Sequence, residues 1–385
     1  MKKSEILQIV GFFLLWSVFL QLVMYLAPHF LVFQPSFPYA DELAKYNLAP
    51  SITALANFDG VHYLTIANSG YFGIGLIQAF FPLFPLLMHF LHLIIDNLLL
   101  AGLLLAQVFA LSSMLSFYYL VKIYYGQKIA RRALLAMSVF VSAFYLRSLY
   151  NEGLFLTLVF GTFIAAKKGH FTYAGILAAL ASATRIVGIG LWPSLLLFVW
   201  LHQRHNYKAY LQVSLSVFGL IGYMVYLYLH FHDPLYFFSV QSQFGAGRQT
   251  SLILWPQVIW RYLKIFYTVR PFDLKYYVYV QEFLLSVFSL LALVHLAWQG
   301  WWHKRKKYSG ASILEWPHLF FALIAYFLPT MTGNFSSMPR YLLVCFVLFV
   351  YVSRLKKRWF FLYLTSSLIL LIINLILFTQ GYWVA

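Results

Sequence analysis

Long apolar stretches separated by short basic segments dominate the sequence. The stretch from Leu98 to Leu120 stays apolar in every register, whereas a strand of a transmembrane β-barrel would alternate apolar and polar positions. A helix crosses a bilayer with about 20 mostly apolar residues. The pattern therefore predicts an all-α polytopic membrane protein, with one integral membrane domain over residues 1–385.

Composition agrees with this fold class. Hydrophobic residues make up 62% of the 385 residues and charged residues only 10%, whereas soluble domains carry about 25% charged residues. This hydrophobic content supplies about eleven transmembrane helices and leaves little for an aqueous domain. The single cysteine, Cys345, lies in an apolar run, so neither a disulfide nor a structural zinc framework is expected.

Basic residues set the predicted topology, because Lys and Arg mark cytoplasmic loops. The net charge of +17 is therefore attributed to cytoplasmic loops, and no nucleic-acid partner is expected. Most of the 27 Lys and Arg residues fall in six groups, all placed in the cytoplasm: Lys2 and Lys3; Lys122, Lys128, Arg131 and Arg132; Lys167 and Lys168; Arg204 and Lys208; Lys304 to Lys307; and Arg354 with Lys356 to Arg358.

One path through the membrane satisfies this placement. The first apolar run has no small-residue cleavage site and is expected to be an anchor that runs outward. The next segment, residues 28–97, forms a long extracytoplasmic loop, and the later spans alternate in direction. The eleven predicted spans are 7–27, 98–120, 130–146, 153–166, 172–184, 186–201, 209–229, 276–298, 313–330, 341–353 and 359–379.

One further apolar run, Phe80 to Ile95, is predicted to be a re-entrant or surface helix of the long loop. Making it a span would place five of the six basic groups outside the cell. Pro82 and Pro85 suit the start of a helix, where the missing N–H groups cost nothing.

Acidic residues test this topology independently, because the rule concerns only Lys and Arg. All ten fall on or near the outer surface except Glu5 and Glu315. Carboxylates collected on one face suit an external site that acts on hydroxyls or cations. Avoidance of lysine explains four of them equally well: Asp41, Asp96, Asp273 and Glu282.

The long loop contains the segment with the most candidate chemistry, residues 54–73. It predicts a short helix that Asn57 or Asp59 caps and that Gly70 ends in a left-handed conformation. Helical spacing places a carboxylate, an imidazole and a phenol on one face, in the set Asp59, His62, Tyr63 and Ile66. The alternative is that Asp59 only caps the helix and that His62 is a packed interfacial histidine.

Several short blocks, in order along the chain, resemble the PIG-V type mannosyltransferases, a GPI mannosyltransferase 2-like family within the GT-C glycosyltransferases. The blocks combine aromatic, acidic and arginine positions with the proline-rich run of the long loop. They are Phe58-Asp59, His62-Tyr63, Ile66-Ala67 and Gly70-Tyr71; Phe80 to Leu87; Tyr150 to Phe155; Ala181 to Arg185; His232 to Leu235; and Ser337 to Tyr341.

This resemblance implies a GT-C type fold with juxtamembrane helices in the first extracytoplasmic loop. It implies transfer of mannose, with inversion, from a polyprenyl- or dolichyl-phosphate donor to an acceptor hydroxyl of a glycolipid, glycan or protein. The chain length points to a bacterial member in the plasma membrane, with the active site facing outward; a eukaryotic member would lie in the endoplasmic reticulum membrane. The lipid-phosphate sugar is the co-substrate, and neither a metal nor another cofactor is expected.

Under this resemblance each polar residue has an expected role. Asp59 is the general base, because an acceptor hydroxyl must lose its proton during attack. Arg185 and Arg340 are expected to bind the donor phosphate through their fixed guanidinium donors. The residues expected at the sugar or acceptor are His62, Tyr63 and Glu152.

Structural roles remain open for the same arginines. An arginine within a membrane segment costs free energy unless it has a partner. A salt bridge between Arg185 and Glu152 would supply one, and Arg340 could instead extend to the lipid headgroups.

Two other classes of function fit the same composition. A multi-pass transporter or lipid flippase would also carry intramembrane ionisable residues, but no inverted repeat is visible in the sequence. A GT-C-like scaffold subunit without activity would keep the fold and would tolerate the substitution Asp59→Asn.

Overall fold

The computed structural model describes residues 1–385 except 244–248, 250, 272, 306–315 and 385. The described residues form helices and contain no strand, so the predicted all-α class is confirmed. The helices are α1 Lys3–Leu26, α2 Pro50–Thr53, α3 Asp59–Ser69, α4 Leu83–His92, α5 Leu98–Ser138, α6 Glu152–Lys167, α7 Phe171–Ser182, α8 Leu191–His202, α9 Tyr207–Ser214, α10 Phe218–Phe231, α11 Tyr236–Ser239, α12 Trp255–Thr268, α13 Leu274–Arg305, α14 Trp316–Thr330, α15 Met338–Val344, α16 Val347–Ser353 and α17 Lys357–Thr379.

Each predicted span coincides largely with helical segments, but only some are single long helices. By length and composition, helices able to cross a membrane occupy Lys3–His29, Leu98–Ser138, Tyr207–Phe231, Leu274–Gly300 and Lys357–Thr379. The number of membrane crossings therefore stays a prediction. Residues 313–315 of one predicted span, together with Lys306, Lys307 and Glu315, lie outside the described residues.

Two predicted spans, 98–120 and 130–146, are the limbs of one 41-residue helix, α5. Gly126, with φ 80° and ψ 172°, interrupts the helical backbone between the limbs, a conformation that glycine adopts without steric cost. The second limb ends at Ser138, and the 3₁₀ turn Ala143–Leu146 follows it. The helix in the predicted span 130–146 therefore ends earlier than expected, because the chain turns back towards the long loop after Ser138.

The apolar run of the long loop forms the ten-residue helix α4. At about 1.5 Å per residue it extends about 15 Å, half of the ~30 Å hydrocarbon core. This length agrees with the predicted re-entrant or surface helix.

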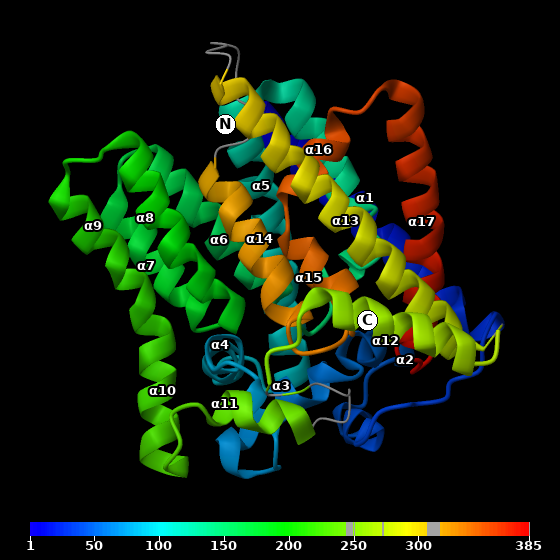
Figure 1. Cartoon of the computed structure of the whole chain (residues 1–385). Coiled ribbons are helices and arrows are strands. Elements are labelled where there is room, and N and C mark those ends of the chain that lie inside the picture. Colours follow the sequence, from blue (N-terminus) through cyan, green and yellow to red (C-terminus); the bar gives the residue numbers. More distant parts are fainter. Residues whose placement is uncertain (244–248, 250, 272, 306–315, 385) are drawn as a thin grey trace.

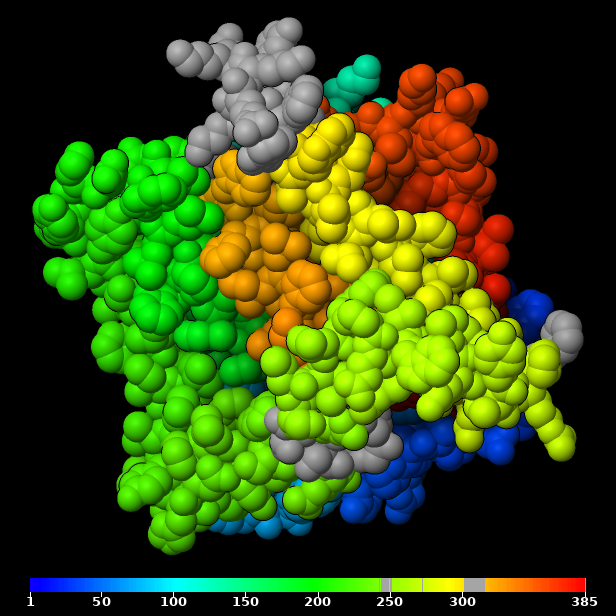
Figure 2. All heavy atoms as spheres, in the orientation of Figure 1, coloured from blue at the N-terminus to red at the C-terminus, as the bar shows by residue number. Residues whose placement is uncertain are grey.

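The long loop gathers at one end of the molecule. Helices α3, α4 and α11 lie at the end opposite to the N-terminus, and α12 runs across the bundle rather than along it (Figure 1). Helices α7 to α10 form a lobe beside α14. This lobe appears at the left in green in the space-filling view (Figure 2).

Small residues let the helices approach closely, as is typical of helix packing in membranes. A Cβ added at Gly153 of α6 would lie 2.9 Å from the backbone nitrogen of Ala110 in α5. In the lobe, a Cβ at Gly219 of α10 would collide with the carbonyl oxygen of Ala179 in α7. Gly222, one turn later in α10, has no neighbour within 4 Å of such a Cβ.

We expect Gly219→Ala to lower the apparent unfolding temperature in detergent, because the added methyl group forces α7 and α10 apart; overpacking of this kind costs about 1–3 kcal/mol. The matched variant Gly222→Ala should unfold at or above the wild-type temperature, since its methyl group enters open space. Fluorescence-detected size-exclusion chromatography after heating measures both. Equal behaviour of the two variants would contradict the close helix contact.

Candidate functional site

A large cavity of about 1420 Å³ opens where the long loop meets the bundle. Its wall combines residues of α3, the segment after α7, and helices α12, α13 and α15. Asp59, His62 and Tyr63 all line it, which confirms that these side chains project from one face of α3. The fourth residue of that face, Ile66, is buried in a neighbouring apolar cluster.

Four charged side chains from distant parts of the sequence meet at this wall. The Nη1 atom of Arg340 lies 2.6 Å from Asp59 Oδ2, a contact between residues 281 positions apart. The Nε and Nη2 atoms of Arg340 donate to Glu152 Oε1 at 3.0 and 2.9 Å. Arg185 Nη1 donates to the same oxygen at 2.9 Å. Two arginines and two carboxylates thus form a neutral cluster, called here the charge quartet.

The quartet is largely shielded from solvent. The side chains of Arg340 and Arg185 are 8% and 11% exposed, while that of Asp59 is 20% exposed. Arg340 also lies over the rings of Tyr145 and Tyr150, 4.9 and 4.7 Å from the ring centroids. Arg340 is therefore paired inside the protein and does not extend to lipid headgroups, whereas the salt bridge between Arg185 and Glu152 is present.

Glu152 lies behind the arginines. It is completely buried and does not line the cavity, unlike Asp59, Arg185 and Arg340. Its Oε2 atom is buried without a hydrogen-bond partner among the described residues. This placement suits a residue that orients the two guanidinium groups better than one that touches a sugar directly.

The backbone before Asp59 is strained. The predicted cap is wrong: Phe58 occupies the N-cap position with φ 61° and ψ −116°, and no side chain caps the helix. Positive φ is rare for a bulky residue and costs free energy. Asn57 instead donates to the carbonyl of Phe378 at 2.8 Å, and the Asp59 N–H donates to the Tyr150 hydroxyl at 3.2 Å. At the other end the predicted residue is right, since α3 ends at Gly70 with a positive φ of 71°, but its ψ of −159° differs from the left-handed helical conformation that was expected.

The aromatic ring of Phe58 secures this strained turn. It packs against Phe37, Phe378 and Trp383, with centroid distances of 4.6, 5.6 and 5.2 Å. These contacts fix the direction in which Asp59 leaves the helix start, so that its carboxylate meets Arg340.

His62 and Tyr63 stand beside the carboxylate. Tyr63 packs edge-on against Phe84 and Tyr150, while the ring centroid of His62 lies 5.0 Å from that of Phe80. Burial lowers the pKa of His62, an effect that the charge of Asp59 partly offsets. His62 is therefore neutral at neutral pH and can both donate and accept a hydrogen bond.

Sequence reasoning missed several residues around the quartet. The hydroxyl of Tyr150 accepts from the backbone N–H of Asp59, and its ring lies under Arg340. The resembling block Tyr150 to Phe155 includes this residue, but no local pattern assigned it a role at the site. Tyr341, which lines the cavity, lies beneath Arg185 with its ring centroid 5.3 Å from the guanidinium carbon. Glu282 also lines the cavity; an acidic residue in an apolar helix was a signal that could have found it.

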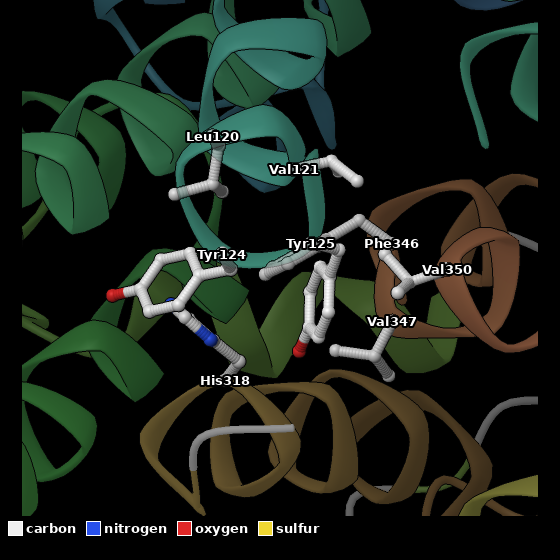
Figure 3. A pocket seen from close by; sticks show the side chains of 8 residues that line it. All are labelled: Leu120, Val121, Tyr124, Tyr125, His318, Phe346, Val347 and Val350. Carbon is white, nitrogen blue, oxygen red and sulfur yellow. The ribbon is translucent and has the colours of Figure 1, made fainter. Parts of the chain in front are cut away.

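A second cavity differs in kind. It lies between α5, α14 and the start of α16, where Tyr124, Tyr125 and His318 meet apolar side chains (Figure 3). Its volume is about 10 Å³, which holds about one water molecule at most. It is too small for a substrate and lacks charged lining residues.

The described residues contain no group of three or more His, Cys, Asp or Glu side chains that could hold a metal ion. The expectation that no metal takes part stays a prediction.

Comparisons with known proteins identify the fold. No family model matches this sequence, and no curated protein matches it. The structure of ArnT from Cupriavidus metallidurans bound to undecaprenyl phosphate is similar over 92% of this chain, with a TM-score of 0.51 and 12% identity. ArnT from the same organism in the apo state is similar over 93% of this chain, with a TM-score of 0.45 and 14% identity.

The chain spans 62% of the length of ArnT in these comparisons. At 12% identity the likeness shows the fold alone, and that fold is of the GT-C type. The fold class expected from the sequence is thereby confirmed, and the long apolar helices agree with an integral membrane protein.

The lowered pKa of His62 makes the folded state sensitive to acid. From about pH 7 to about pH 5 the unfolded chain takes up a proton that folded His62 resists, so stability falls. We expect His62→Gln to show a smaller fall in apparent unfolding temperature over this range than the wild type. The exposed His29 provides the control, because His29→Gln should leave the fall unchanged; an equal fall in all three proteins would contradict the burial of His62.

Proposed function

We propose that this protein is an inverting GT-C glycosyltransferase that moves mannose from a polyprenyl- or dolichyl-phosphate donor to an acceptor hydroxyl. The observation that carries the proposal is the contact between Asp59 and Arg340 in the wall of the large cavity. A proton acceptor and a phosphate-binding cation, the two groups that this reaction needs, are adjacent there.

Asp59 is the proposed general base. Its Oδ2 atom accepts from Arg340, which leaves Oδ1 to accept the proton of the acceptor hydroxyl. The hydroxyl oxygen then attacks the anomeric carbon from the face opposite to the phosphate, and the proton passes to the carboxylate. The bond from the anomeric carbon to the phosphate oxygen breaks, and its electron pair leaves with the lipid phosphate.

Arg340 and Arg185 are proposed to stabilise the charge of that leaving phosphate. A guanidinium group has five N–H donors in a fixed fork, and the contacts of Arg340 with Asp59 and Glu152 use three of them. Both arginines line the cavity while Glu152 holds them from behind. Donors placed in advance in this way need little rearrangement during the reaction.

The dimensions of the cavity suit two co-substrates. Sites for single small molecules measure about 300–1000 Å³, and this cavity, at about 1420 Å³, is larger. His62 and Tyr63, next to the base, are proposed to orient the sugar or the acceptor. The acceptor is proposed to be a hydroxyl of a glycolipid, glycan or protein.

Two likenesses support the choice of donor. The fold is similar to that of ArnT, which was crystallised bound to undecaprenyl phosphate. The blocks around Asp59, Arg185 and Arg340 resemble the PIG-V type mannosyltransferases. We propose a bacterial plasma-membrane member of that family whose cavity faces outward.

Asp59→Asn tests the base. The variant should insert and fold, yet lose transfer by about 10²- to 10⁴-fold, because the amide cannot take the hydroxyl proton. Transfer is measured in proteoliposomes from synthetic polyprenyl-phosphate carrying radiolabelled mannose, with membrane lipid extract as acceptor.

Asp96→Asn is the matched control, since Asp96 lies in the same loop but does not line the cavity, and it should retain wild-type transfer. Unchanged turnover in Asp59→Asn would remove Asp59 from the mechanism. No turnover in the wild type would favour a different lipid-phosphate sugar, a scaffold subunit or a transporter.

Arg185→Ala and Arg340→Lys test the phosphate site. Each should raise the KM for the donor by about tenfold or more, because a charged, bidentate hydrogen bond is lost, while the KM for the acceptor changes less. Arg270→Ala is the control, because Arg270 is exposed and lies outside the cavity lining. Unchanged donor KM in both variants would show that the phosphate binds elsewhere.

A further inference from the structure

Glu282 is an acidic residue inside α13, a helix long and apolar enough to cross a membrane. It is only 2% exposed, although it lies in the cavity wall. A carboxylate at such a position is costly unless other groups stabilise it. The hydrogen bonds that stabilise the Glu282 carboxylate therefore indicate its role.

Both oxygens of Glu282 accept hydrogen bonds. The hydroxyl of Tyr262 in α12 donates to Oε2 at 2.6 Å, and the backbone N–H of Ser337 donates to Oε1 at 3.1 Å. The Tyr262 hydroxyl in turn accepts from the backbone N–H of Phe335 at 3.2 Å. Burial raises the pKa of Tyr262, and the charge of Glu282 raises it further, so the phenol stays protonated and keeps its donor.

These contacts converge on the turn formed by residues 335–337. All three backbone N–H groups of this turn donate to side chains. Ser336 donates to Asn334 Oδ1 at 3.1 Å, while Phe335 donates to Tyr262 and Ser337 to Glu282. Side chains therefore hold the backbone of this turn in place. Glu282 accepts one of the three hydrogen bonds directly and contributes to a second one through Tyr262.

The turn leads directly to the arginine of the charge quartet. Ser337 has φ 63° and ψ 12°, a left-handed conformation that a residue with a Cβ adopts only at a cost. Its carbonyl accepts from the backbone N–H of Arg340 at 3.0 Å. The conformation of Ser337 therefore sets where α15 starts and where the Arg340 side chain begins.

We propose that Glu282 is a positioning residue for donor binding: it holds the 335–337 turn in its strained conformation and thereby aims Arg340 at the lipid phosphate. The inference rests on the proposed function, because it assumes that Arg340 binds this phosphate. Glu282 itself does not touch the phosphate; repulsion between a carboxylate and a phosphate also argues against direct contact.

The substitution Ser337→Gly separates this role from a direct contact with substrate. Glycine adopts positive φ without the steric cost, so Ser337→Gly should make the turn less dependent on Glu282. A variant that lost a direct substrate contact would gain nothing from the same change.

The experiment measures the Kd of undecaprenyl phosphate by native mass spectrometry for the wild type, Glu282→Ala, Ser337→Gly and the double variant. We expect Glu282→Ala to bind about tenfold more weakly than the wild type, and the double variant to recover most of that loss, with Ser337→Gly as its reference. Gln281→Ala is the matched control: Gln281 is also buried in α13, but it bonds to Asn374 of α17, so its loss should not affect binding.

Wild-type affinity in Glu282→Ala, or a double variant no better than the single one, would overturn the positioning role alone. A wild type that does not bind undecaprenyl phosphate would overturn the proposed donor as well. If Glu282→Ala fails to fold, Glu282→Gln replaces it: the amide keeps the volume and one acceptor, so a smaller loss with the same recovery by Ser337→Gly is expected.

Discussion

The buried guanidinium of Arg340, held between the carboxylates of Asp59 and Glu152, is the interaction on which the site depends. Neutralising the fully buried Glu152 would leave an uncompensated buried charge on the arginines, which is strongly destabilising, whereas Asp59 is partly exposed and can lose its charge at a smaller cost. The cluster joins α3 of the long loop, the start of α6 and the start of α15. It therefore closes the loop onto the bundle and at the same time places the carboxylate of Asp59 next to two guanidinium groups in the cavity wall.

The two helices that carry Asp59 and Arg340 both begin after a residue with an unusual backbone φ angle. Phe58 before Asp59 and Ser337 before Arg340 both have positive φ, at 61° and 63°. Each costs free energy that surrounding contacts must offset. Aromatic packing surrounds Phe58, and the turn before α15 donates hydrogen bonds to Glu282 and Tyr262. Strain of this kind at both ends of one ion pair suggests that the protein is built to hold that pair.

The sequence was sufficient for the fold class and for the polar face of α3, because both follow from periodic patterns that are local. It also suggested the pair of Arg185 and Glu152, as an alternative to substrate binding. The contact of Asp59 with Arg340 spans 281 residues, and no local pattern encodes it. Likewise, the apolar runs predicted where the spans lie but not where their helices are interrupted. The backbone conformation of Gly126 in α5, for example, depends on how neighbouring segments pack.

The most direct test of this account is a cryo-electron microscopy structure of the protein with undecaprenyl phosphate in a lipid nanodisc. We expect the phosphate within hydrogen-bond distance of Arg340 and Arg185, with a free oxygen of Asp59 facing the remaining cavity. Density for the phosphate beside Arg261 and Lys275, which also line the cavity, with the charge quartet untouched, would contradict the account.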